Sequence, residues 1–214
     1  RKGYKEHYLF EYNIPYINKR KTWGIALKTE LFRMQQFYYN TINHQLIYTE
    51  ENTNLLKDKK LSFSIQYKPK INIVHKIELE ATKMEINQIT DNADFLYNND
   101  EIFKFIRLEY LFTQEKRDYK SFPLDGSMNQ VCIEYYHGLE NKYKNINLIL
   151  KTENHNKFDT KWSIGNSIKV KNSLRQDIPY VLNSGFGFED YLRGYEYYVI
   201  DGTHFVMSKT AIKH

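Results

Sequence analysis

The sequence predicts an all-β protein, an antiparallel up-and-down β-barrel of the large kind that crosses a membrane with strands. Two observations lead to this prediction. Apolar and polar residues alternate with a period of two through about ten segments. These segments are roughly 9 to 15 residues long, whereas strands of soluble sheets usually have ~5–6 residues and a tilted membrane crossing needs ~9–11.

The alternation is clearest in three segments, residues 23–31, 60–68 and 158–170. In the second of these, Leu61 and Phe63 share one face with two further apolar residues, and lysine, serine and glutamine occupy the other. Each segment therefore predicts a strand with one apolar and one polar face. Weaker alternation predicts further strands at 4–14, 36–49, 72–86, 101–115, 129–138, 144–154 and 196–212.

Several of the polar faces carry charge in the middle of a long strand. The charged pairs are Lys28 and Glu30, Glu78 and Glu80, and Arg107 and Glu109. On a soluble sandwich such residues would face water on the outside, and in a large barrel they would line a wet lumen. Alternation leaves both readings open. Strand length and the 19 tyrosines, which suit surfaces that are apolar at one end and wet at the other, favour the barrel.

The breaks between these segments contain turn-forming residues. Pro15 ends the first predicted strand, because proline cannot donate to a strand ladder. Phe122-Pro123 and Asp125-Gly126 predict a hairpin connection before a strand that begins near residue 128. Residues 91–100, with the sequence DNADFLYNND, are interpreted as a polar loop.

Composition argues against several function classes. The net charge of +5 comes from scattered lysines, and without an RNA-binding aromatic motif or zinc-finger spacing we expect no nucleic-acid partner. Cys132 is the single cysteine and is expected to be a small strand side chain. The seven histidines stand singly and no nucleophile motif is present, so we expect no enzyme activity, no metal and no cofactor. No signal peptide and no apolar run of ~18 residues is visible.

One stretch near the end is distinctive: residues 190–202 read DYLRGYEYYVIDG and follow Gly185-Phe186-Gly187. With long alternating strands on both sides, this arrangement resembles the Omp85 superfamily of outer-membrane barrels, which includes the BamA/TamA assembly proteins, the surface antigen D15 type and two-partner secretion transporters. That family carries an Arg-Gly-Tyr or Arg-Gly-Phe in a long loop late in the barrel. Here Arg193, Gly194 and Tyr195 stand in that place. The turn with Phe122, Pro123 and Gly126 also resembles a recurrent mid-barrel turn of the family.

The resemblance implies a fold and a location. Residues 1–214 would form part of a single outer-membrane β-barrel domain, about ten strands of a sixteen-stranded barrel, in the outer membrane of a Gram-negative bacterium. No POTRA-like pattern is visible in the sequence. The resemblance also implies partners: the lipid bilayer, unfolded outer-membrane or secreted protein clients, and accessory assembly subunits. The function it implies is assistance to the insertion or translocation of proteins at the outer membrane.

The resemblance further implies that Arg193 pins its loop inside the lumen as a lock. An arginine presents five donors and stays charged, so it can bridge acids on the wall. Local acids that could pair with it are Glu189, Asp190 and Glu196. The alternative is that Arg193 is an exposed hairpin residue. Two other functions stay open: a dedicated two-partner-type secretion pore or a barrel fused to a soluble enzyme domain, and a soluble all-β binding module.

Overall fold

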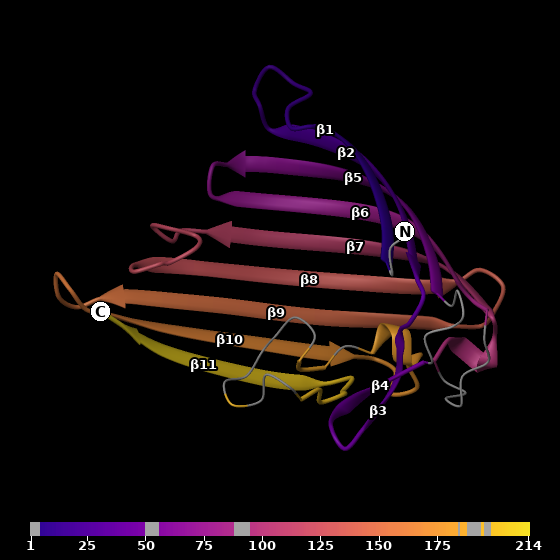
Figure 1. Ribbon diagram of the computed structural model, residues 1–214. Coiled ribbons are helices and arrows are strands. Elements are labelled where there is room, and N and C mark those ends of the chain that lie inside the picture. The colour runs from indigo at the N-terminus through magenta and orange to yellow at the C-terminus, as the bar shows by residue number, and fades with distance from the viewer. Residues whose placement is uncertain (1–4, 50–55, 88–94, 184, 188–193, 195–197) are drawn as a thin grey trace.

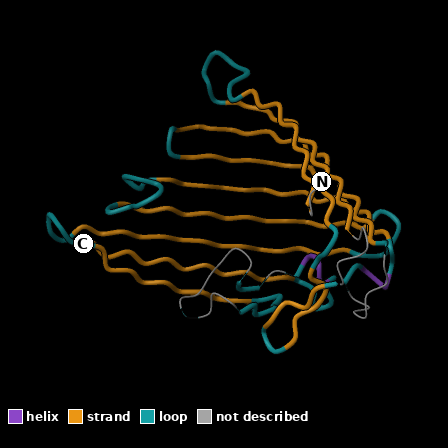
Figure 2. Tube along the Cα trace, in the orientation of Figure 1, coloured by secondary structure: helices purple, strands orange, loops and turns teal. Residues whose placement is uncertain are grey.

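The computed structural model describes residues 5–49, 56–87, 95–183, 185–187, 194 and 198–214. Nine antiparallel strands form one sheet, which we call the wall (Figures 1 and 2). The strands lie in the wall in the order in which they follow in the chain, which confirms the all-β, up-and-down prediction. They are β1 (Lys5–Ile14), β2 (Trp23–Met34), β5 (Leu56–Lys70), β6 (Ile73–Ile86), β7 (Ile102–Glu115), β8 (Gly126–Gly138), β9 (Lys144–Lys157), β10 (Ser163–Ser173) and β11 (Phe205–Lys213).

The wall curls around a hollow, with β1 and β11 as its two edge strands (Figure 1). Outside the wall, the described residues contain two short 3₁₀ helices, η1 (Tyr97–Asn99) and η2 (Tyr180–Leu182). No helix among the described residues has the length and apolar character that a membrane crossing requires.

The predicted strand at 36–49 is wrong: this segment is a hairpin of two short strands in a separate sheet. The strands are β3 (Tyr38–Ile42) and β4 (Gln45–Tyr48). Asn43 and His44 turn the chain between them with positive φ angles of 51° and 63°. Asparagine and histidine are among the non-glycine residues that most often adopt this conformation, so the residue types at the turn were the signal for the hairpin.

Two predicted strand starts are also wrong. The strand expected from 158 begins at Ser163, because a turn closed by the amides of Phe158 and Asp159 on the carbonyl of Trp162 precedes it. The strand expected from 196 begins at Phe205. In the described residues before it, pairing is limited to the isolated bridge between Phe186 and Ile200. In both places the alternation of apolar and polar residues begins in the connection before the strand, so it does not mark the strand boundary.

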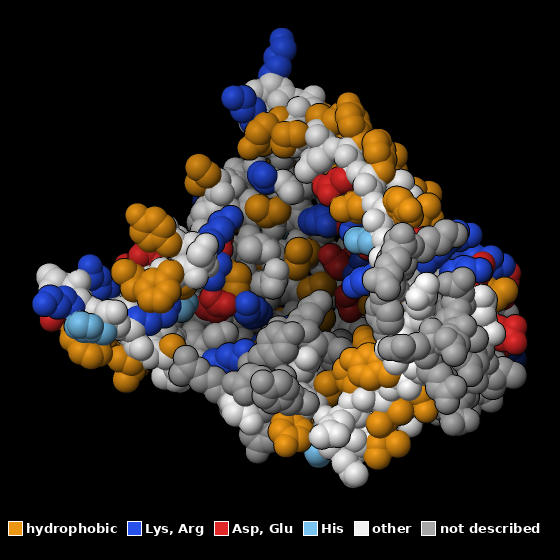
Figure 3. Space-filling view, in the orientation of Figure 1, with side chains coloured by type: hydrophobic (Ala, Val, Ile, Leu, Met, Phe, Trp, Pro, Cys, Tyr) orange, Lys and Arg blue, Asp and Glu red, His pale blue; other side chains and the backbone are white. Residues whose placement is uncertain are grey.

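The two faces of the wall differ in chemistry, as the alternation predicts. The convex face is apolar: Leu61, Ile77 and Leu108 are 54%, 53% and 44% exposed, and similar residues occupy the outward positions of the other strands. Away from the loop end the concave face is polar, with lysines, arginines and acids gathered in the hollow (Figure 3). An exposed apolar face of this size is unusual for a soluble monomer and is typical of an interaction surface.

The two ends of the wall differ in the length of their connections. At one end, which we call the turn end, the strands are joined by residues 15–22, 71–72, 116–125 and 158–162. At the other, the loop end, they are joined by residues 35–55, 87–101, 139–143 and 174–204. Short turns at one end and long loops at the other are the pattern of bacterial outer-membrane barrels.

The hydrophobic core lies at the loop end, on the concave face. Inward residues of the wall, among them Met84, Phe103 and Phe105, pack against Phe95 and other apolar residues of the long connections. These connection residues form what we call the cap: Phe37, Phe95, Leu96 and Tyr180. The interpretation of 91–100 as a polar loop is therefore wrong in its described part, because Phe95 and Leu96 are buried.

Candidate functional site

An arginine on β7 lies at the centre of a carboxylate cluster on the concave face. One guanidinium nitrogen of Arg107 lies 3.0 Å from Glu78 and 3.2 Å from Glu80. The other lies 2.8 Å from Glu109 and 3.4 Å from Glu134. The strand register produces the cluster, since Arg107 pairs with Glu80 on β6 and Glu109 pairs with Glu134 on β8. The concave placement expected for Glu78, Glu80, Arg107 and Glu109 in a barrel is found, and Glu134 is a member that the sequence did not reveal.

The polar character of the concave face extends along the wall on both sides of this cluster. Toward β1, Lys28 lies 3.0 Å from Glu30 on β2, and Lys60 lies 3.0 Å from Asp58 on β5. On the other side, Lys151 lies 2.8 Å from Glu153 on β9. Toward β10, the amide of Asn147 donates to Glu134 at 3.0 Å and its oxygen accepts from Ser173 at 2.6 Å. Such paired charges suit a wet lumen in which water reaches the side chains but the strands hold them in register.

Three long connections are tied together above the hollow. The hydroxyls of Thr41 and Tyr180 lie 2.6 Å apart, and burial raises the pKa of Tyr180 to about 12. The amide of Val199 donates to the carbonyl of His44 at 2.8 Å. The amide of Val181 donates to Phe95 at 3.1 Å. The β3–β4 hairpin, the β6–β7 connection and the β10–β11 connection therefore support one another at the loop end.

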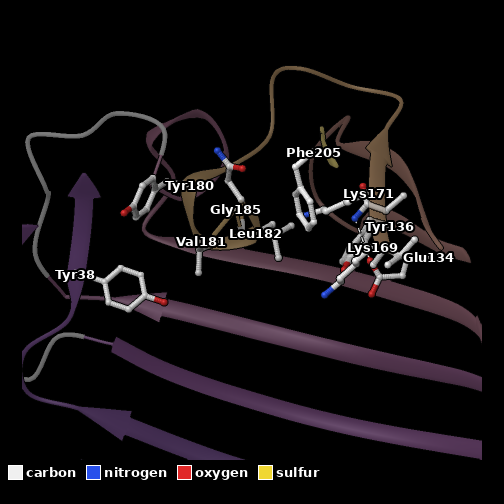
Figure 4. Close-up of a pocket in the computed structure, with 13 residues that line it drawn as sticks. Tyr38, Glu134, Tyr136, Lys169, Lys171, Tyr180, Val181, Leu182, Gly185 and Phe205 are labelled. Carbon is white, nitrogen blue, oxygen red and sulfur yellow. Dashed lines mark hydrogen bonds between the residues drawn. The ribbon is translucent and has the colours of Figure 1, made fainter. Parts of the chain in front are cut away.

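A cavity of about 350 Å³ lies between η2 and the inward side chains of the wall (Figure 4). Lys169, Lys171 and Glu134 come to it from the strands, and Tyr180 and Leu182 from the connection above. Glu134 is the one carboxylate among the described residues that line it. The cavity thus offers a polar space beneath the segment that leads toward residue 193.

Most of the predicted lock falls outside the described residues. Arg193 and Tyr195 lie there, and so do the candidate partners Glu189, Asp190 and Glu196. Gly194 is described and has a φ of +83°, with no heavy atom within 4 Å of the position a Cβ would occupy. That φ is one that glycine adopts freely and other residues adopt at a cost.

The predicted turn at Phe122, Pro123 and Gly126 lies in the β7–β8 connection at the turn end. Gly126 has a φ of +99°, and a Cβ there would lie 2.2 Å from the carbonyl oxygen of Lys116, so only glycine fits. Lys213 of β11 reaches this turn, with its ammonium 2.5 Å from the Pro123 carbonyl and 4.7 Å from the Phe122 ring centre. The turn is therefore joined to a strand ninety residues further along the chain.

Arg117 holds the same turn from the other side. Its guanidinium lies 2.6 Å from Glu115 and 2.6 Å from Glu153 on β9. The hydrogen bonds that Arg117 donates to Glu115, and the nearby charge of Glu153, raise the pKa of Arg117. From the sequence, Arg117 was expected only to precede the turn, and its partner on β9 is 36 residues away.

Aromatic residues form a row on the convex face near the turn end. The ring centres of Trp23 and Tyr67 lie 4.6 Å apart, those of Tyr67 and His75 6.1 Å, and those of His75 and Phe112 5.2 Å. Nδ1 of His75 lies 3.0 Å from the Tyr110 hydroxyl. Rows of aromatic rings at the border of an apolar band are found where a barrel meets the membrane interface.

Among the described residues, one group of three could offer ligand atoms to a metal. These residues are Glu109, Cys132 and Glu134, whose ligand atoms lie within 4.8 Å of one another. Arg107 already contacts both carboxylates, which lowers the need for a cation there. Cys132 is a buried side chain on β8, as the sequence predicts.

Comparison with known proteins identifies the fold. The wall is similar to the crystal structure of BamA from Haemophilus ducreyi lacking POTRA domains 1–3, with a TM-score of 0.64 and 13% sequence identity. The match covers 89% of this chain and 38% of that chain, so the sequence spans well under half of the BamA structure. No protein-family model and no curated protein matches the sequence. The chain therefore has a BamA-like β-barrel fold.

Proposed function

We propose that the chain is part of a β-barrel in the outer membrane of a Gram-negative bacterium, with its convex face against the lipid bilayer. The observation that carries this proposal is the division of the wall into an apolar convex face and a concave face whose middle carries paired charges, from Lys28 on β2 to Glu134 on β8. In water the convex face would expose many large apolar side chains, whereas in a bilayer it would meet acyl chains. The aromatic row from Trp23 to Phe112 would lie at the interface.

Within that class, the function that we favour is assistance to the insertion or translocation of proteins, of the Omp85 or BamA/TamA type. Two features support this choice: the BamA-like fold and the Arg-Gly-Tyr sequence at Arg193 in the long β10–β11 connection. Its partners would be unfolded outer-membrane or secreted protein clients and accessory assembly subunits. The chain itself would act without catalysis, as a wall and a loop cap.

In this proposal Arg193 reaches into the hollow and holds its connection there. Glu189, Asp190 and Glu196 are local candidate partners, and Glu134 is a candidate on the wall because it lines the cavity beneath the connection. A guanidinium among acids forms charge-assisted hydrogen bonds that are about twice as strong as neutral ones. We expect Arg193→Ala in the full-length protein to weaken function while the barrel stays folded. Unchanged activity in that variant would argue against the lock.

Depletion in the native cell tests the function. The full-length protein is depleted, and every other outer-membrane barrel in the envelope is quantified by mass spectrometry. A general fall across unrelated barrels is the expected result for an assembly factor. The loss of one exported protein alone would instead indicate a dedicated two-partner-type secretion pore, and no change would contradict the assembly function.

A separate measurement tests the membrane placement. The apolar convex face predicts that the purified protein aggregates without detergent or lipid and becomes monodisperse in detergent. A protein that stays monomeric in plain buffer would contradict the barrel and support a soluble all-β binding module. An enzyme domain fused to the barrel would be recognised from the gene around this sequence.

A further inference from the structure

A second cavity, of about 440 Å³, opens on the concave face at the turn end. Its floor is formed by inward residues of β9, β10 and β11, and its roof by the β7–β8 turn that Lys213 holds in place. Three small floor residues, Gly165, Ser167 and Ala211, leave the space that larger side chains would fill. The cavity is distinct from the one beneath η2, with which it shares no lining residue.

The lining of this cavity, which we call the turn-end pocket, is strongly basic. Its cations are Arg117, Lys120, Lys151, Lys209 and Lys213, and its one acid is Glu153. Five positive charges and one negative charge leave a net charge of +4 on the lining. A concave site lined by one sign of charge concentrates its field and attracts ions of the opposite sign.

The internal ion pairs of the pocket do not account for all of its cations. Glu153 is shared by Arg117 at 2.6 Å and Lys151 at 2.8 Å. Lys213 donates to the neutral carbonyl of Pro123. Within the part of the chain that the structure describes, Lys120 and Lys209 make no ion pair. The ammonium groups of these two exposed lining residues are thus available to a ligand.

A buried histidine provides a second and independent indication of a ligand. His155 lines the pocket and is 9% exposed, yet neither of its ring nitrogens has a hydrogen-bond partner in the described structure. Its Nε2 lies 3.5 Å from Glu153, which is ion-pair range and too long for a good hydrogen bond. The ring lies over Gly165, where a Cβ would be 2.4 Å from Nδ1. Because buried polar groups are nearly always hydrogen-bonded, a buried imidazole that makes no hydrogen bond in a pocket indicates a missing partner.

We propose that the turn-end pocket binds a phosphate-bearing anion between Lys120 and Lys209, with His155 as a further donor. We choose phosphate as the ligand because the pocket cations that are not already bound to an acid are lysines. The planar guanidinium of Arg117, which would suit a planar carboxylate, is already occupied by Glu115 and Glu153. The remaining cations are lysines, which act as mobile point charges and bind tetrahedral, multiply charged phosphate well.

The site goes beyond the proposed function and does not rest on it, because the pocket is formed by the fold alone. Two sources could supply the same chemistry: a soluble phosphate ester, or the headgroup of an anionic phospholipid. Both would place a phosphate near lysines at the turn end, where the turns of an outer-membrane barrel face the periplasm.

Calorimetric titration of the full-length protein, purified in a neutral detergent, tests the site with inorganic pyrophosphate as the probe. We expect saturable binding that Lys120→Gln with Lys209→Gln weakens by about a hundredfold, since two charge-assisted contacts are lost and each is worth on the order of a tenfold change. Both lysines are exposed, so the variant loses no buried packing. The matched control is Lys19→Gln with Arg20→Gln, which removes the same charge from exposed positions in the β1–β2 turn at the same end.

The results of the titration distinguish a specific site from general attraction between charges. Weakening confined to the pocket variant supports the site. Equal weakening in the control, no saturable binding of pyrophosphate, or equal binding of malonate, a dicarboxylate, would each overturn it. In the supporting case, competition by short-chain phosphatidylglycerol identifies a lipid headgroup as the source, and its failure to compete identifies a soluble phosphate.

Discussion

At the loop end, aromatic side chains from four connections pack over the concave face, whereas at the turn end the β7–β8 turn covers it and ion pairs hold that turn. Phe103 and Tyr143 are fully buried at the first end. At the second, Arg117 and Glu153 keep about a tenth of their side chains exposed. The same strands pass through both regions. A barrel wall can therefore be dry and packed at one end and charged at the other, because the side chains along each strand are independent of its backbone pairing.

The largest expected effect lies at the loop end. Phe103→Ala removes a ring with 0% exposure that contacts Phe105 and Tyr143, and we expect a loss of about 3–5 kcal/mol in the free energy of unfolding. Urea unfolding of the full-length protein in detergent measures it. Because the contact is apolar, the loss should be the same at low and high salt. A loss below about 1 kcal/mol would mean that the core at this end is not packed as described.

The next effect concerns the middle of the wall, between the two ends. Arg107→Met leaves four carboxylates close together without their central cation. We expect a loss of about 3 kcal/mol near neutral pH. Protonation of the acids relieves their repulsion, so the loss should shrink as the pH falls. Arg107→Lys is the control that keeps the charge, and a pH-independent loss in the methionine variant would contradict the electrostatic account.

A smaller effect is expected at the turn end. Arg117→Ala removes the contacts to Glu115 and Glu153, and we expect a loss of about 2 kcal/mol, since the pairs are only partly exposed. In contrast to Phe103→Ala, this loss should diminish in about 1 M salt, because partly exposed ion pairs are screened. Unfolding curves for the two variants at two salt concentrations test the contrast, which would fail if both behaved alike.

The smallest effect returns to the loop end. Tyr180→Phe keeps the ring in the cap and removes the hydrogen bond to Thr41, for an expected loss of about 1 kcal/mol. Exchange of amide hydrogens in the β3–β4 hairpin is the sensitive measurement, because the bond joins that hairpin to η2. Faster exchange confined to the hairpin is expected, and unchanged exchange would show that the apolar contacts alone hold the cap.

The sequence predicts the strands of the wall well, because in each strand the alternation of apolar and polar residues shows which residues share a face. Alternation around Leu61 and Leu108 sufficed to place strands and assign faces. It could not place the partners of Arg107 beyond its own strand, since Glu134 joins the cluster only through the register between β7 and β8. The pairing of Arg117 with Glu153 likewise depends on how a turn folds over three strands.

The connections were predicted less well, for a different reason. Phe95 and Leu96 lie in a stretch rich in aspartate and asparagine, and only the other connections make their burial favourable. Asn43 and His44 are residue types that favour a turn with positive φ. The turn was nevertheless missed, because the alternation on both sides of it resembles one continuous strand. The predicted lock around Arg193 stays a prediction, because that residue lies outside the described part of the chain.

The meander of the wall also bears on how the protein folds. Each wall strand pairs with the wall strands that precede and follow it, so the sheet can grow one strand at a time, with loops of at most the length of the β10–β11 connection to close. The contacts of the cap are of another kind, since Thr41 and Tyr180 are 139 residues apart in the chain. Closing so long a loop before the intervening strands are paired would lose much chain entropy. The kinetic order should therefore be sheet first and cap last, with the hollow open at the loop end until the final step.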